Sequence, residues 1–168
     1  MLTHRVLVVM GVSGSGKSSV GELLANRAGY DFLDGDSFHP SANVEKMSQG
    51  TPLTDADRAP WLAILRQKIE ESLAAGRGVV LACSALKARY REVLAGSTPN
   101  QVRFVHLKGS FELIQSRMTS RADHFMKSGM LRSQFEALEE PLDALVMDIS
   151  DKPHEIVDAI LEAESANF

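Results

Sequence analysis

The chain contains a single cysteine, Cys83, no long apolar run and no excess of basic residues. One cysteine forms neither an intrachain disulfide nor a cysteine-based metal cluster, which favours a reducing compartment. A membrane helix needs about 18 consecutive apolar residues, and residues 1–5 lead into a short apolar run without a signal-peptide pattern. The formal net charge of -4 argues against general binding to nucleic acids. We therefore expect a cytoplasmic protein that binds neither nucleic acid nor membranes.

The acidic residues are unevenly distributed. Residues 136–168 contain ten of the 22 acidic residues and one basic residue, Lys152, whereas residues 1–135 contain 17 basic and 12 acidic residues, a net charge of +5. A cationic body suits an anionic substrate such as a nucleotide. A solvated helical face accounts for the acidic segment equally well.

Length and composition indicate one globular domain spanning residues 1–168. The chain is 44% hydrophobic and 24% charged, and a chain of 168 residues can bury a core without disulfides or metals. Short apolar runs alternate with segments of helical spacing, as in βαβ units. The runs that predict strands lie at 5–10, 30–33, 79–83, 102–107 and 145–149. We predict a three-layer α/β fold, a five-stranded parallel sheet with helices on both faces.

Capping residues indicate where several helices begin. Ser84 and Ser110 are placed to cap the helices after the third and fourth strands, and Ser133, three residues before a glutamate, opens another. Residues 121–130 fit neither the helical nor the strand period and are basic. This segment, between two helices, is a candidate lid.

Two helices are predicted after the second strand. The first, at 41–48, is stopped by Gly50. The second is a long amphipathic helix closed by Gly76, and its start is open. Thr54 begins a capping-box pattern, whereas Pro60 fits a first helical position after a later cap.

The most specific motif is GVSGSGKS at residues 11–18, which follows a predicted strand and precedes a predicted helix. Glycines let the backbone fold closely around an anion, and exposed N–H groups and the positive end of the helix bind phosphates. Lys17 bridges the β- and γ-phosphates, and the Ser18 hydroxyl ligates Mg²⁺. The motif therefore predicts a nucleoside triphosphate and Mg²⁺ as ligands. The predicted nucleotide-binding residues of this segment are Gly11, Val12, Ser13, Gly14, Ser15, Gly16, Lys17, Ser18 and Ser19.

A phosphate-binding loop alone does not distinguish a kinase from a switch GTPase or a motor. The chain lacks the Asn-Lys-x-Asp segment of guanine-specific switches, and a motor or AAA-type machine needs a longer chain. Asp34 and Asp36 follow the second strand, so one can hold Mg²⁺ while the other orients an acceptor hydroxyl and takes its proton. We assign Asp36 as the base and Asp34 to the metal, and the reverse assignment also fits the sequence. His39 either hydrogen-bonds a polar substrate or is structural.

Four segments carry a resemblance to the gluconate kinases. They are the loop at 11–18, DGDSFHPSANVEKMSQGTPLTDADRAPWL at 34–62, CSALKARYREVL at 83–94 and RADHFMKSGMLRSQFEALEEP at 121–141. The resemblance implies ATP-dependent phosphorylation of D-gluconate at its 6-hydroxyl, giving 6-phosphogluconate and ADP. It also implies the small-kinase fold, with a substrate-binding region at about 37–75, a lid at about 121–132 and a homodimer.

A sugar acid requires a cation for its carboxylate and short polar groups for its hydroxyls. Arg58 is the best candidate for the carboxylate, unless it forms a salt bridge with Asp55 or Asp57. Lys87 and Arg91 are four residues apart, so on one helix they share a face and add positive charge at the substrate. Their alternative role is as surface charges of that helix.

Two arginines lead into the proposed lid. Arg117 and Arg121 are four residues apart on one helical face, which favours an anion near them. By resemblance to small kinases, Arg121 closes over the transferring phosphoryl group and Arg117 lies on the adenine side. His124 joins the lid contacts. Trp61 has the spacing of a core residue more than that of a platform for stacking sugars.

Two other functions remain open at this point. A shikimate or nucleotide kinase of the same fold is one, but shikimate kinases carry a Gly-Gly-Gly run after the third strand, where this chain has Ala82, Cys83 and Ser84. The other is a nucleotide-dependent regulatory protein without acceptor chemistry, which would leave the two aspartates and the clustered arginines without a role.

Overall fold

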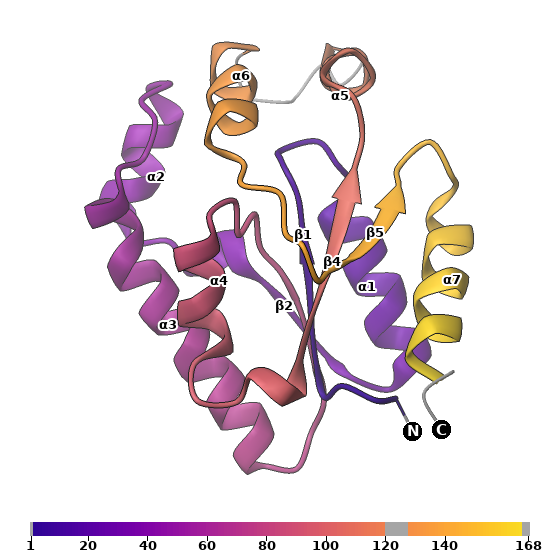
Figure 1. Ribbon diagram of the computed structural model, residues 1–168. Coiled ribbons are helices and arrows are strands. Elements are labelled where there is room, and N and C mark those ends of the chain that lie inside the picture. Colours follow the sequence, from indigo (N-terminus) through magenta and orange to yellow (C-terminus); the bar gives the residue numbers. More distant parts are fainter. Residues whose placement is uncertain (1, 120–127, 166–168) are drawn as a thin grey trace.

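Strands and helices alternate along the chain in the computed structural model, which describes residues 2–119 and 128–165 (Figure 1). The strands are β1 (Val6–Met10), β2 (Asp31–Asp34), β3 (Val79–Ala82), β4 (Val102–Lys108) and β5 (Leu145–Asp148). The α-helices are α1 (Lys17–Ala28), α2 (Ser41–Ser48), α3 (Asp55–Ala74), α4 (Ala88–Ala95), α5 (Phe111–Thr119), α6 (Ser128–Ala137) and α7 (Pro153–Ser165). Two short 3-10 turns lie at Gly35–Phe38 and Pro99–Gln101.

The five strands form one parallel sheet in the order β2-β3-β1-β4-β5. In the centre, Val8 of β1 pairs with Leu81 of β3 on one side and with Phe104 of β4 on the other. Every residue of β1 is buried, as expected for a parallel strand covered on both faces. The sequence prediction of a five-stranded parallel sheet is confirmed.

The sheet is covered by helices on both faces, so the predicted three layers are also confirmed. Helices α1 and α7 lie on one face and α3 and α4 on the other (Figure 1). The alternation of β1 side chains explains both layers, because Leu7 and Val9 join the core with α1 and α7, whereas Val6 and Val8 join the core with α3 and α4. Helices α2, α5 and α6 lie around the carboxyl ends of the strands (Figure 1).

Two of the four helix starts considered follow the sequence signal. Ser110 accepts a hydrogen bond from the backbone N–H of Leu113, as predicted. Helix α3, whose start the sequence left open, is capped by Thr54. The Thr54 hydroxyl accepts from the backbone N–H of Asp57, and the Thr54 backbone N–H donates to the Asp57 carboxylate, which completes a capping box. Pro60 lies inside this helix.

The other two predicted starts are wrong. Helix α4 begins at Ala88 and not after Ser84, because Ala85 takes a left-handed conformation (φ 46) and Leu86 is buried, so the chain stays irregular until Lys87. Helix α6 begins at Ser128, before the predicted start at Ser133. Burial of Met130 and Leu131 against the core stabilises this extra turn.

The predicted lid at 121–132 is covered only in part. Residues 120–127 lie outside the described residues, and the remainder belongs to α6. Among residues 2–119 and 128–165, no helix is both long enough and apolar enough to span a membrane.

Candidate active site

The phosphate-binding loop runs from the end of β1 to the start of α1 and requires glycine for two reasons. At Gly11, a Cβ atom would lie 2.9 Å from the carbonyl oxygen of Leu107, which is closer than a real side chain approaches. Gly16 precedes α1 with φ 95, in the left-handed region that favours glycine. The sequence therefore folds this loop tightly around an open centre.

The backbone N–H groups of this loop face that centre largely unpaired. Among the residues that the structure describes, none accepts a hydrogen bond from the N–H of Gly14, Gly16, Lys17, Ser18 or Ser19. Ser15 N–H bonds to the Val12 carbonyl at 3.2 Å. Unpaired amides at the positive end of a 12-residue helix form a site for an anion, which fits the phosphates of a nucleotide.

Lys17 points back into the loop. Its Nζ donates a hydrogen bond to the Val12 carbonyl at 3.0 Å. Burial lowers the pKa of Lys17, and the negative charge of Asp36 is the main opposing influence. An incoming phosphate would stabilise the charged ammonium in the same way.

Asp34 and Asp36 have separate positions. Asp34 ends β2, and its Oδ1 accepts a hydrogen bond from the Asp36 backbone N–H at 3.1 Å. Gly35 lies between them against β3, where a Cβ atom would be 2.7 Å from the Ala82 carbonyl oxygen. The Asp36 side chain is 76% exposed and lines the main cavity, whereas Asp34 does not line it. Of the two carboxylates, Asp36 therefore faces the cavity.

His39 is held beside Asp36 by buried neighbours. Its ring stacks on the Trp61 indole at 4.1 Å, and Trp61 Nε1 donates to the Gly35 carbonyl at 2.7 Å. The Asn43 amide nitrogen donates to the Asp57 carbonyl at 2.9 Å and lies 3.2 Å from His39 Nδ1.

These contacts fix the protonation of His39. Because an amide N–H points at Nδ1, the imidazole proton lies on Nε2, which is 4.0 Å from Asp36 Oδ1. Burial lowers the pKa of His39, although Asp36 opposes the shift. The neutral imidazole therefore keeps its Nε2–H available beside the carboxylate that faces the cavity.

One cavity of about 520 Å³ connects the phosphate-binding loop to the region after β2. The predicted site residues that line it are Ser13, Lys17, Asp36, His39, Arg58 and Lys87. On its α6 side it is lined by Met130, Ser133, Gln134 and Ala137. Trp61, predicted as core, is 1% exposed and also contributes to the wall. The loop, two carboxylates (Asp36 and Asp55) and the cations Arg58 and Lys87 thus line one cavity.

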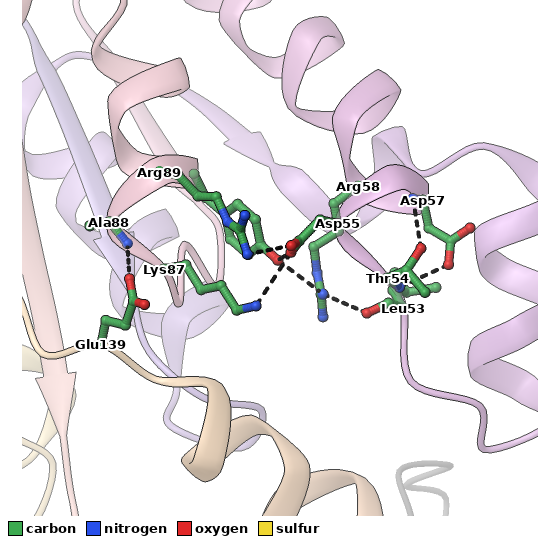
Figure 2. Close-up of polar contacts among 10 residues, drawn as sticks. Leu53, Thr54, Asp55, Asp57, Arg58, Lys87, Ala88, Arg89 and Glu139 are labelled. Atoms are coloured by element: carbon green, nitrogen blue, oxygen red, sulfur yellow. Dashed lines mark hydrogen bonds and ion pairs between the residues drawn. The ribbon is translucent and has the colours of Figure 1, made fainter.

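Arg58 and Lys87 line one part of this cavity, called its cationic end below, which also holds Asp55 and lies beside Arg89 (Figure 2). Arg58 forms no salt bridge with Asp55 or Asp57 within the described chain; its Nη1 donates to the Leu53 carbonyl at 2.6 Å and lies 3.3 Å from the Tyr90 hydroxyl. Asp57 instead pairs with Lys46 and caps α3, and these bonds lower the pKa of Asp57 to about 2. Arg58 therefore keeps donors for a ligand.

The prediction that Lys87 and Arg91 share a helical face is wrong. Lys87 precedes α4 in an extended conformation (φ -111, ψ 147), so four-residue spacing does not place the two side chains together. Arg91 is buried, does not line the cavity and donates to the carbonyls of Ala85 at 2.7 Å and Glu139 at 2.8 Å. Arg91 is a structural residue, and Lys87 alone faces the cavity.

The predicted lid residues are only partly described. Arg117 donates through Nη2 to the Ile149 carbonyl at 2.6 Å, beside the end of β5, and does not line the main cavity. Arg121 and His124 lie outside the described residues. Cys83 is buried and its pKa is raised to about 12, which agrees with its interpretation as a non-nucleophilic residue.

Ser18, in the first turn of α1, and Asp34, at the end of β2, carry oxygen atoms, the ligand type that Mg²⁺ prefers. Within the described residues, no group of three or more His, Cys, Asp or Glu side chains could hold a metal by itself. A site of few protein oxygens fits Mg²⁺, which keeps several waters and binds substrate phosphates.

Four residues at this site escaped the sequence prediction. They are Asn43, Asp55, Tyr90 and Gln134, whose Oε1 accepts from the Ser13 backbone N–H at 2.6 Å. The sequence analysis treats Asp55 only as a possible partner for Arg58 and gives Tyr90 no role. Each lies in a segment that carries the resemblance, which is the one signal that singles them out.

Comparisons with known proteins agree with this geometry. A family model described as an AAA domain matches residues 6–145, a range that contains the phosphate-binding loop. The chain is 49% identical over 168 residues to a gluconokinase of Gluconobacter oxydans (strain 621H), which covers 99% of this chain and 93% of that protein. The crystal structure of a gluconokinase from Sinorhizobium meliloti 1021 has a TM-score of 0.89 at 44% identity and covers 99% and 94% of the two chains.

A more distant structure separates fold from family. A shikimate kinase from Acinetobacter baumannii matches with a TM-score of 0.60 at 18% identity, covering 98% and 95% of the two chains, which shows a common fold alone. The sequence analysis expects an AAA-type machine to need a longer chain than this one. The family match does not conflict with that expectation, because it concerns one nucleotide-binding domain and not a whole machine. Because the chain is 44–49% identical to these gluconokinases over nearly its whole length, it belongs to the gluconokinase family of P-loop kinases.

Proposed function

We propose that this chain transfers the terminal phosphoryl group of ATP to the 6-hydroxyl of D-gluconate, giving 6-phospho-D-gluconate and ADP. The observation that carries the proposal is one cavity that is lined both by Ser13 and Lys17 of the loop and by Arg58 and Lys87. A linear sugar acid fits between them with its carboxylate at the cations and its far hydroxyl at the loop.

Each end has a defined chemical task. Unpaired amides of the loop and the Lys17 ammonium hold the phosphates, and their charge stabilises the transferring group. Asp36 orients the acceptor hydroxyl and takes its proton late, because phosphoryl transfer has a loose transition state. His39, which lines the cavity, hydrogen-bonds a polar group of the substrate, and Arg58 with Lys87 holds the carboxylate.

ATP and Mg²⁺ complete the proposed site. Ser18 and Asp34 would hold Mg²⁺, directly or through water, where it bridges phosphate oxygens and neutralises charge. By resemblance, Arg121 closes over the transferring phosphoryl group, Arg117 lies near the adenine and His124 contacts the substrate. We also propose a cytoplasmic homodimer, in keeping with the single buried cysteine and with the resemblance.

The test is a panel of acceptors in a coupled ADP-release assay. Turnover with D-gluconate is expected to exceed by far that with shikimate, gluconate epimers or AMP. Equal rates across the panel would reject the assignment. ATP binding without any phosphorylated product would favour a regulatory protein, and phosphorus NMR of the product would locate the new ester at C6.

A further inference from the structure

One carboxylate lies at the centre of the cationic end of the cavity. Both oxygens of Asp55 are occupied: Oδ1 accepts from the Tyr90 hydroxyl and lies 3.4 Å from Lys87 Nζ, and Oδ2 pairs with Arg89 (Figure 2). Arg58 joins the group through the Tyr90 hydroxyl at 3.3 Å. These five residues are called the Asp55 cluster below.

Asp55 is built to remain charged. It is the first residue of α3, after the capping residue Thr54, where the helix dipole favours an anion. The Tyr90 hydrogen bond, followed by the contacts with Lys87 and Arg89, lowers the pKa of Asp55 below its ordinary value of 3.8. Its carboxylate therefore stays ionised over the pH range in which sugar acids and phosphates are ionised.

The charge of the cluster determines which anion it can accept. Two cationic side chains, Lys87 and Arg89, pair with Asp55 directly, and a third, Arg58, joins through the Tyr90 hydroxyl. Asp55, Arg58 and Lys87 line the cavity itself. A carboxylate ligand brings one negative charge, whereas a phosphate monoester brings about 1.5–2 at neutral pH. Without Asp55, the cations would attract the dianion more strongly than the monoanion, because Coulomb energy scales with ligand charge.

We propose that Asp55 is a specificity-determining residue that restricts this end of the cavity to a carboxylate and disfavours a phosphate monoester. The inference rests on the proposed function, whose product carries one group of each kind. A cavity that accepted phosphate at the cationic end would bind the product in the reversed direction. Asp55 thereby limits inhibition by the product.

The test uses Asp55→Asn, which removes the charge and keeps an oxygen for the Tyr90 hydroxyl. 6-Phospho-D-gluconate is measured as a competitor of D-gluconate at saturating ATP. The γ-phosphoryl group of ATP then fills the loop end of the cavity, so the product can bind only in the reversed orientation, with its phosphate at the cationic end. At low ionic strength the inhibition constant of the product should fall about tenfold, and the KM for D-gluconate only about threefold, because the dianion gains twice the Coulomb energy.

Two variants make the result specific. Arg89→Gln removes a positive charge, so it should raise both the inhibition constant and the KM. The change should be smaller than in Asp55→Asn, because the Arg89 side chain is 60% exposed. Asp57→Asn, in the same helical turn but paired with Lys46, should leave the ratio of the two constants unchanged. If Asp55→Asn raises both constants together, Asp55 only supports the structure and the proposal is wrong.

A pH series separates charge from shape. At about pH 5 a phosphate monoester carries close to one charge, since its second pKa is about 6. The difference between wild type and Asp55→Asn in the ratio of the constants should therefore shrink towards that pH, and a constant difference would overturn the proposal. No turnover of D-gluconate by wild type would instead reject the proposed function.

Discussion

The two ends of the cavity come from different parts of the chain, and main-chain groups face the ligand at one end whereas side chains face it at the other. At the phosphate end, the groups that face the ligand are mainly backbone amides of one continuous segment, 11–19. At the sugar end they are long side chains from two segments distant in sequence, as Arg58 of α3 and Lys87 before α4 show. A main-chain site depends on loop geometry, whereas a side-chain site depends on which neighbours occupy each polar group. Substitutions should therefore have different signatures at the two ends.

Asp36 lies between the ends, and its removal should have the largest effect. Asp36→Asn keeps the shape but cannot take the acceptor proton, so kcat should fall by about 10²–10⁴. ATP affinity should change little, because the phosphates are bound by the loop. Steady-state kinetics and titration with a non-hydrolysable ATP analogue measure the two effects. Asp31→Asn, at the other end of β2, is the control, and near wild-type turnover in Asp36→Asn would assign the base elsewhere.

The phosphate end can be tested at its one long side chain. Lys17→Met removes the ammonium that faces the transferring phosphoryl group, and kcat/KM for ATP should fall by about 10²–10³. The loss should be the same for every acceptor, because Lys17 does not contact the sugar in the proposed arrangement. A loss that depends on the acceptor would show that the two ends are not separate. Lys68→Met on the exposed side of α3 serves as the control.

The sugar end should give the opposite signature. Arg58→Lys keeps the charge but loses the planar fork, and KM for D-gluconate should rise about 10–100-fold, as expected for lost charge-assisted hydrogen bonds. The KM for ATP should stay within about twofold of wild type, since the loop is untouched. Kinetics with each substrate varied in turn provide the measurement. An equal rise in both KM values would contradict the comparison.

Trp61 connects the sugar end to the turn that carries Asp36. In Trp61→Phe the Gly35 carbonyl loses its indole donor, and a buried carbonyl without a partner costs about 1–3 kcal/mol of unfolding free energy. Urea denaturation should detect this loss, and kcat should fall by less than in Asp36→Asn because the carboxylate remains. Unchanged stability would mean that the turn is held by other contacts.

The smallest expected effect is on the pH dependence of stability. Burial lowers the pKa of His39 in the folded protein, so below about pH 6.5 the unfolded chain binds a proton that the folded chain does not. The contribution of neutral His39 to the free energy of unfolding is therefore fully present above about pH 6.5. It is lost as the pH falls towards the lower pKa that His39 has in the folded protein. In denaturant unfolding, the free energy of unfolding of His39→Gln should decrease less than that of wild type between pH 7.5 and 5.5.

His106 provides the internal control for that experiment, because burial lowers the pKa of His106 as well and it is present in both proteins. Its contribution cancels in the difference between them. Parallel stability curves for wild type and His39→Gln would mean that His39 is not held neutral at the cavity.

Local signals were sufficient for the sheet and for several caps. Apolar runs placed all five strands within about two residues of their ends. The signal was continuous in β1 and β3, whose residues are all buried, because a parallel strand covered on both faces needs an apolar sequence. The capping box at Thr54 was readable because its partners are three residues apart. Ser84 and Ser133 were misleading, since burial of Leu86 and Leu131 overrode the local capping pattern.

The sequence by itself determined the phosphate-binding loop, the pair of carboxylates after β2 and the order of strands and helices. Each of these depends on residues adjacent in the chain, whose spacing dictates the backbone. Tertiary structure decided that Lys87 faces the cavity while Arg91 is buried, and that Asp55 lies among three cations. The role of a long charged side chain is set by the groups that pack around it, and here several of those groups come from segments more than 30 residues away.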